Sequence, residues 1–68
     1  MSDKQTITTI IIDDELQAID LLEAFLRTFD EIQLLGKECD PTAGLELVKS
    51  NPPDILFLDI DMPDMSGL

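Results

Sequence analysis

The sequence predicts an α/β fold in which three parallel strands alternate with two helices. Short apolar segments alternate along the chain with segments whose apolar residues recur at helical spacing. The last apolar segment, Ile55 to Leu58, has no polar residue in it, which is typical of a strand covered on both faces of a parallel sheet. The expected order is therefore β-α-β-α-β, that of an open α/β sheet.

The first strand and the first helix are expected on either side of an acidic pair. Residues Thr6 to Ile12 are mostly β-branched, which favours a buried strand. A helix is expected from Glu15 to about Phe29, where Glu23 and Arg27 form a favourable i,i+4 pair. The apolar positions expected to face the core are Leu16, Ile19, Leu22 and Leu26, widened by Ala18, Leu21, Phe25 and Phe29.

The second half repeats this strand and helix arrangement. A strand is expected from Ile32 to Glu38. Asp40 then supplies a helix N-cap and Pro41 a first-turn proline, and the helix runs over Thr42 to Ser50 until the Asn-Pro-Pro segment 51–53 stops it. The residues of this helix expected to point inward are Leu45 and Val48.

Three carboxylates are expected at one edge of the sheet. Crossovers between parallel strands are right-handed, so a third strand placed on the far side of the first gives strand order 2-1-3, with the helices on opposite faces. The carboxyl ends of strands 1 and 3 then meet at the crevice where such folds bind ligands. Asp13 and Asp14 follow strand 1 and Asp59 follows strand 3.

Carboxylates brought together in this way need a counter-charge. Two of them ~5 Å apart repel by about 3 kcal/mol at an effective dielectric of ~20. A hard divalent cation with oxygen ligands, Mg²⁺ above all, relieves this repulsion. The chain has no histidine, and its pattern places none of its four basic residues at this edge: Lys4, Arg27, Lys37 and Lys49.

Composition excludes several classes of partner. The chain has 68 residues and a net charge of −11, so it holds one domain at most and lacks the basic surface that nucleic acids or anionic membranes require. Its first residues do not resemble a signal peptide, and Cys39 is its only cysteine. A cytoplasmic protein is therefore expected.

Two segments resemble the acidic motifs of response-regulator receiver domains in two-component signalling. They read TIIIDDE and DILFLDIDMPDMSGL, and the resemblance covers nearly all the chain from Ile7 onward. It implies a flavodoxin-like fold. The wording of both motifs is most similar to that of regulators carrying a LytTR-type DNA-binding domain.

The resemblance also implies roles for individual residues. Asp59 resembles the phosphoacceptor, Asp14 the direct metal ligand and Asp13 a ligand acting through water, while Asp61 would offer its backbone carbonyl to the metal. The residues that would shape the loop after strand 3 are Met62, Pro63 and Gly67.

The implied function is phosphorelay signalling. Members of the family accept a phosphoryl group, with Mg²⁺ required, from a sensor histidine kinase or a small phosphodonor, and pass the signal to a covalently linked output domain. They have five strands and carry a Ser or Thr and then a Lys after the last two. Residues 1–68 offer strands 1 to 3 and helices 1 and 2, so they are predicted to be the N-terminal part of a truncated receiver domain that lacks these switch residues. An exposed apolar edge on strand 3 would favour a dimer or strand-exchanged assembly in which another chain completes the sheet.

Other interpretations stay open at this point. The acidic pair could serve only to start a helix, and Asp59 could be an ordinary loop residue. A phosphatase of the haloacid-dehalogenase type would use Asp59 as nucleophile and Asp61 as general acid, although Pro63 stands where that family has Thr or Val. A receiver-like interaction module that is never phosphorylated is the third alternative.

Overall fold

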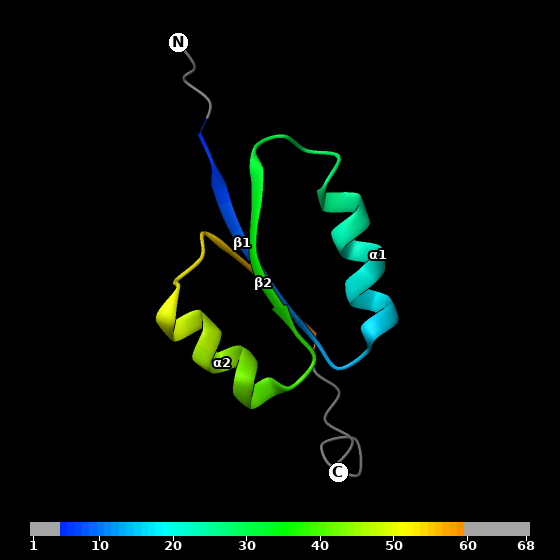
Figure 1. The fold of residues 1–68 in the computed structure, drawn as a ribbon, viewed down its shortest axis with the longest axis vertical. Helices are drawn as coiled ribbons and strands as arrows, with labels where there is room; N and C mark the ends of the chain where they lie inside the picture. Colours follow the sequence, from blue (N-terminus) through cyan, green and yellow to red (C-terminus); the bar gives the residue numbers. More distant parts are fainter. Residues whose placement is uncertain (1–4, 60–68) are drawn as a thin grey trace, which may run out of the picture.

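A computed structural model describes residues 5–59 of the chain. Three parallel strands form one sheet in the order β2-β1-β3 (Figure 1). This is the predicted truncated flavodoxin-like arrangement, and the strand order 2-1-3 is confirmed. The elements in chain order are β1 (Ile7–Asp13), α1 (Leu16–Leu26), β2 (Ile32–Glu38), α2 (Pro41–Ser50) and β3 (Ile55–Asp59).

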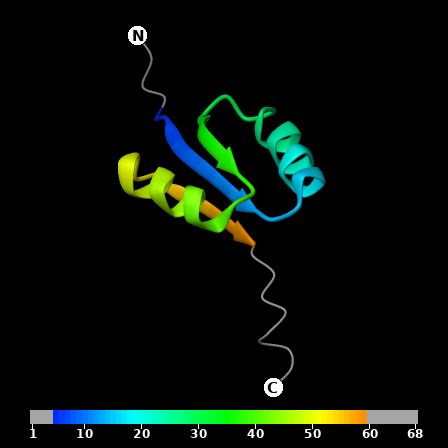
Figure 2. The same ribbon diagram turned by 60° about the horizontal axis from the view of Figure 1, so that its bottom comes forward.

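The two helices cover opposite faces of the sheet, with β1 between them (Figure 2). On one face, Ile19 and Leu26 of α1 pack against Ile11 of β1 in a buried cluster. On the other face, Gly44 of α2 lies directly against Ile12. Because successive side chains of a strand point to opposite faces, a strand covered on both sides must be apolar at every position. The continuous isoleucine run of β1 follows from this requirement.

Helix α1 ends three residues earlier than the periodicity predicts. The amides of Thr28 and Phe29 donate to carbonyls three residues back, those of Phe25 and Leu26, so the chain tightens into a turn after Leu26. The phenyl rings of Phe25 and Phe29 meet edge to face at 5.3 Å. Four residues of the predicted apolar stripe are exposed, one from its centre and three from its margins, which corrects their assignment to the core: Leu16, Leu21, Phe25 and Phe29.

Helix α2 begins as predicted but faces the sheet with different residues. The Asp40 side chain caps it by accepting a hydrogen bond from the Ala43 amide, 3.0 Å long. The prediction that Leu45 points inward is wrong, because its side chain is 56% exposed. The buried position is Gly44, whose missing side chain lets the helix approach β1 closely. Apolar periodicity overlooks such a contact, since glycine does not register as an apolar residue.

The pairing of β1 with β2 contains one irregularity. Thr9 pairs with Leu34, whereas Ile10 pairs with Gly36, so Leu35 is an extra residue in β2. A bulge of this kind changes which residues face each side of the sheet. Leu34 faces the α1 side and packs on the Ile11 cluster, and Lys37, level with Ile11, also lies on that side.

Candidate functional site

The candidate site lies where β1 and β3 end. Asp13 and Asp59 are the last residues of these strands and are direct partners in the parallel pairing. Neighbouring strands lie about 4.8 Å apart, and paired residues of parallel strands point to the same face. Ile11 and Phe57 pair two positions earlier and pack on the α1 side, so the two aspartates lie on the α1 side as well. The structure thus brings together two residues that are 46 positions apart in the sequence.

The turn between β1 and α1 fixes the first of these carboxylates. Oδ1 of Asp13 accepts a hydrogen bond from the Glu15 amide at 3.0 Å. This contact holds the side chain near the beginning of α1, whose free amides favour negative charge. Asp14, the residue between them, lies in the turn and is exposed.

A groove opens beside the two aspartates. It has a volume of about 300 Å³ and lies between α1 and the ends of β1 and β3. Apart from the two carboxylates, its lining is apolar. The lining residues are Ile11, Ile12, Asp13, Ala18, Leu22, Phe57, Leu58 and Asp59. A ligand at the carboxylates would therefore touch water on one side and an apolar wall on the other.

The donor set at this edge fits a divalent cation of the magnesium type. Among residues 5–59, no group of three His, Cys, Asp or Glu side chains is arranged to hold a metal ion. Mg²⁺, however, is usually held by only one or two carboxylates and completes its shell with water and phosphate oxygens. Asp13 and Asp59 supply two such carboxylates. The other predicted positions, Asp61, Met62, Pro63 and Gly67, lie outside the described residues.

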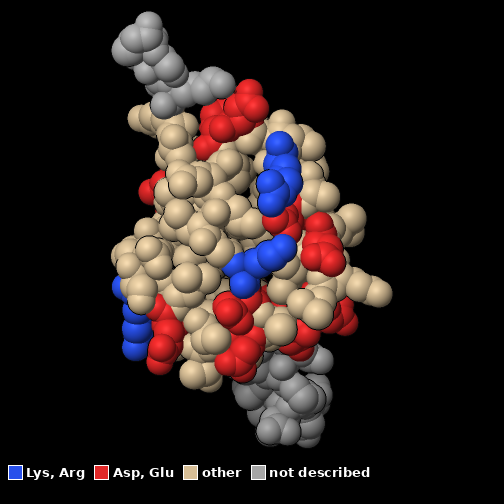
Figure 3. Space-filling model, in the orientation of Figure 1, with Lys and Arg blue, Asp and Glu red and all other residues tan. Residues whose placement is uncertain are grey.

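Acidic side chains gather at the same end of the molecule. In Figure 3 many of them lie toward the lower end, where the strands end in Figure 1, while other acidic side chains lie at the upper end and basic side chains lie both further up and at the lower left. Such a distribution attracts cations more than anions. An incoming phosphate would meet repulsion at this end unless a cation accompanied it.

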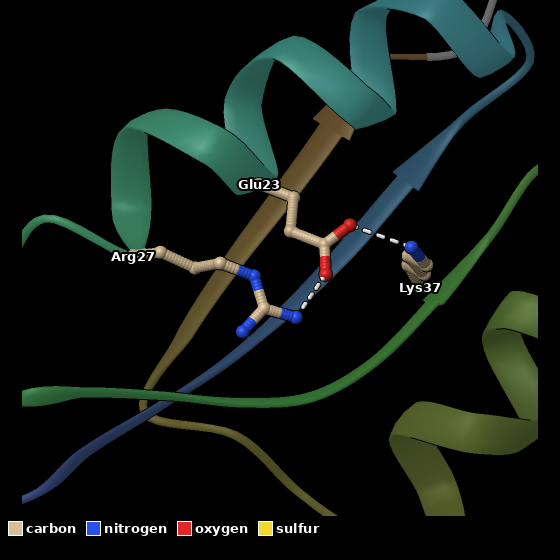
Figure 4. A network of polar contacts seen from close by, with 3 residues as sticks. All are labelled: Glu23, Arg27 and Lys37. Carbon is tan, nitrogen blue, oxygen red and sulfur yellow. Dashed lines mark hydrogen bonds and ion pairs between the residues drawn. The ribbon is translucent and has the colours of Figure 1, made fainter.

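Two basic residues, Arg27 and Lys37, are engaged with a different carboxylate. Glu23 on α1 binds Arg27 at 2.6 Å and Lys37 of β2 at 2.5 Å (Figure 4). The hydrogen bonds from Lys37 and then Arg27 lower the pKa of Glu23 below its ordinary value of 4.5. The Glu23–Arg27 pair was predicted from its spacing and is confirmed, whereas Lys37, fourteen residues away in sequence, was not foreseen.

A polar contact at the opposite end of the same two strands was also missed. Thr8 donates to Oδ2 of Asp54 from its amide at 3.0 Å and from its hydroxyl at 3.1 Å. The Asp54 amide in turn lies 2.9 Å from both the hydroxyl and the carbonyl oxygen of Thr8. The sequence does contain a signal for this contact. An Asp that follows two prolines and directly precedes an apolar strand is well placed to accept a hydrogen bond from the backbone of a neighbouring strand.

Comparison with known proteins identifies the family to which the chain belongs. The family model of the response regulator receiver domain matches residues 9–68. The chain therefore belongs to the receiver domains of two-component response regulators. No solved structure gives a match.

Several curated relatives carry the same domain within longer proteins. The chain is 40% identical over 62 residues to the transcriptional regulatory protein BtsR of Escherichia coli. This match covers 91% of the chain and 26% of that protein. It is 34% identical over 68 residues to the transcriptional regulatory protein MctR of Rhizobium johnstonii, covering 100% and 32%. A protein-glutamate methylesterase/protein-glutamine glutaminase of Methylobacillus flagellatus is 36% identical over 63 residues, covering 93% and 18%. The chain thus spans between about a fifth and a third of the length of these relatives.

Between residues 5 and 59, neither helix is long and apolar enough to cross a membrane.

Proposed function

We propose that this chain receives a phosphoryl group on Asp59 from a sensor histidine kinase, with Mg²⁺ held by Asp13, Asp14, Asp59 and the backbone carbonyl of Asp61. The observation that carries the proposal is the direct pairing of Asp13 with Asp59 at the carboxyl edge of the sheet, beside an open groove. Membership in the receiver family supports it. The same site offers no histidine, cysteine or serine among residues 5–59 that could act as an alternative acceptor beside these carboxylates.

The chemistry asked of the chain is simple. A carboxylate oxygen of Asp59 attacks phosphorus, an oxygen–phosphorus bond forms, and the bond from phosphorus to the donor's imidazole nitrogen breaks. The imidazole leaves with the electron pair of that bond and takes a proton from water. Bound Mg²⁺ would neutralise charge on the phosphoryl oxygens. The chain's own contribution is to hold Asp59 level with Asp13 and to present both beside the apolar lining of the groove.

The wider role follows from the family. In receiver domains, the Ser or Thr and the Lys that complete the switch belong to the strands that follow the third one. A covalently linked output domain, of the LytTR DNA-binding type on the wording of the motifs, would carry the response. Two relatives named as transcriptional regulatory proteins support an output that acts on transcription. The protein acts in the cytoplasm, where a sensor kinase presents its phosphohistidine.

Phosphodonor labelling of the full-length protein tests the proposal. Incubation with a small acyl phosphate and Mg²⁺ should label the wild-type protein, and chelation of Mg²⁺ should prevent labelling. Asp59→Asn should abolish it, whereas Asp20→Asn, the same charge change at an exposed position on α1, should leave it intact. Asp13→Asn and Asp14→Asn should raise the Mg²⁺ concentration required for half-maximal labelling.

Two outcomes would contradict the proposal. Label that persists in Asp59→Asn would show that another residue is the acceptor. A wild-type protein that takes up no label with Mg²⁺ present would favour an interaction module that signals without phosphorylation.

A further inference from the structure

The β1–β3 pairing poses a problem of register that apolar packing alone does not solve. Parallel strands are not held in register by a tight turn, and here 41 residues separate the end of β1 from the beginning of β3. In most sheets, alternation of apolar and polar residues prevents a slip of one position, because the slip exposes the apolar set. The facing segments of β1 and β3, Ile10–Ile12 and Leu56–Leu58, are apolar on both faces. A slip of one residue would exchange one apolar contact for another.

Thr8 and Asp54 provide the missing constraint. They lie one pair before the first residues in the β1–β3 register, Thr9 and Ile55. Their contact is reciprocal, since Oδ2 of Asp54 accepts both the amide and the hydroxyl of Thr8 while the Asp54 amide donates back to Thr8. A slip of one position in either direction would bring an apolar residue or a proline against one member of the pair. It would leave a carboxylate or a hydroxyl without its partner.

The same offset links this contact to the acidic edge. Thr8 and Asp54 are 46 residues apart in sequence, and so are Asp13 and Asp59. The two pairs lie five positions apart along the strands, about 16 Å at ~3.3 Å per residue. A slip of one residue would move the Asp59 side chain to the α2 face of the sheet, away from Asp13 and from the groove.

We propose that Thr8 and Asp54 are positioning residues for the acidic site: their reciprocal hydrogen bonds fix the register of β3 on β1 and thereby hold Asp59 level with Asp13. The inference concerns register first, and it rests on the proposed function only where it extends to phosphorylation.

Two pairs of variants in the full-length protein test the inference. Thr8→Val removes the hydroxyl and keeps the side-chain shape, whereas Thr8→Ser keeps the hydroxyl. Asp54→Ala removes both acceptor oxygens, whereas Asp54→Asn keeps one of them. Glu23→Gln is the matched control for general loss of stability, because it breaks a contact between α1 and β2 and leaves the β1–β3 ladder untouched.

Register and activity are read separately. Nuclear Overhauser contacts between the backbones of Ile10 and Leu56 report the register directly. With each variant kept fully folded, Thr8→Val and Asp54→Ala should weaken these contacts and slow labelling of Asp59 by about tenfold, because a displacement of ~1 Å caused far from the reacting atoms can cost ~100-fold in rate. Thr8→Ser should restore both readouts, and Glu23→Gln should change neither.

The outcomes distinguish this inference from the proposed function. If the wild-type protein is labelled and Thr8→Val and Asp54→Ala match Glu23→Gln in register and rate, the positioning role is overturned and the function stands. If the wild-type protein is not labelled, the proposed function fails, and the Ile10–Leu56 contacts alone decide whether the pair sets the register.

Discussion

Replacement of Gly44 by alanine should destabilise the domain, although the same change in an ordinary helix stabilises it. In a helix interior, alanine is favoured over glycine by about 1 kcal/mol. At Gly44, however, a Cβ atom would lie 2.6 Å, 2.8 Å and 3.0 Å from Cδ1, Cγ1 and Cγ2 of Ile12, where ordinary contacts begin at 3.4 Å. Ile12 is only 2% exposed and branched at Cβ, so Cγ1 and Cγ2 cannot both turn away.

The expected size of this effect follows from two opposing terms. Overpacking a filled core costs about 1–3 kcal/mol. With a middle value of about 2 kcal/mol, and the helix preference of about 1 kcal/mol set against it, the net loss is about 1 kcal/mol. For a small domain with an m-value of ~2 kcal/mol/M, the urea midpoint of unfolding should fall by about 0.5 M.

Two companion variants make the test specific. At Gly36 the added Cβ would come within 2.6 Å of only one methyl group of Leu47, the end of a flexible side chain, so Gly36→Ala should leave the midpoint unchanged or raise it. Ile12→Val removes the Cδ1 atom and should reduce the cost of Gly44→Ala in a double-mutant cycle. A Gly44→Ala protein as stable as the wild type, or more stable, would refute the reasoning.

Three other substitutions test other parts of the fold in urea titrations of the same kind. Ile19→Ala empties part of the buried cluster under α1 and should cost about 2–5 kcal/mol, so a loss below 1 kcal/mol would contradict the assigned core. Asp40→Ala removes the side-chain cap of α2 and should cost about 1 kcal/mol, with Asp40→Asn retaining most of the stability. Glu23→Gln should lower the midpoint at pH 7. Because contacts with Lys37 and Arg27 lower the pKa of Glu23, its contribution is fully present above 4.5 and is lost as the pH falls through the lowered pKa, so the difference between wild type and variant should shrink below pH 4.5. A difference that stays constant down to pH 2 would contradict the ion-pair assignment.

The order of strands and helices could be predicted from the sequence because it depends on short-range patterns of residues. The residues of β2 were predicted at their observed bounds, and the Asp40 cap and the strand order were also correct. Each depends on neighbours in sequence or on the handedness rule for parallel strands. The end of α1 was misplaced because apolar residues continue to Phe29, whereas the backbone turns after Leu26.

The contacts that were not predicted join residues far apart in the sequence. The approach of Gly44 to Ile12 and the Thr8–Asp54 contact join residues 32 and 46 positions apart, and no local pattern specifies either. The candidate site was predictable in part. The pairing of Asp13 with Asp59 across β1 and β3 follows from the fold. The roles of individual residues as metal ligands and phosphoacceptor came from the resemblance to receiver domains and stay a prediction.

The extra residue in β2 has a consequence for solubility. Within the described sheet β2 is an edge strand, and a regular edge offers a continuous row of backbone donors and acceptors to any passing strand. The irregularity at Leu35 breaks the spacing of that row midway, and the charged Lys37 follows it two residues later. A strand from another chain could form backbone hydrogen bonds with the part of β2 before the irregularity or with the part after it, but not with both. The irregularity that lets Lys37 reach α1 should therefore also discourage this edge from recruiting other chains into fibres.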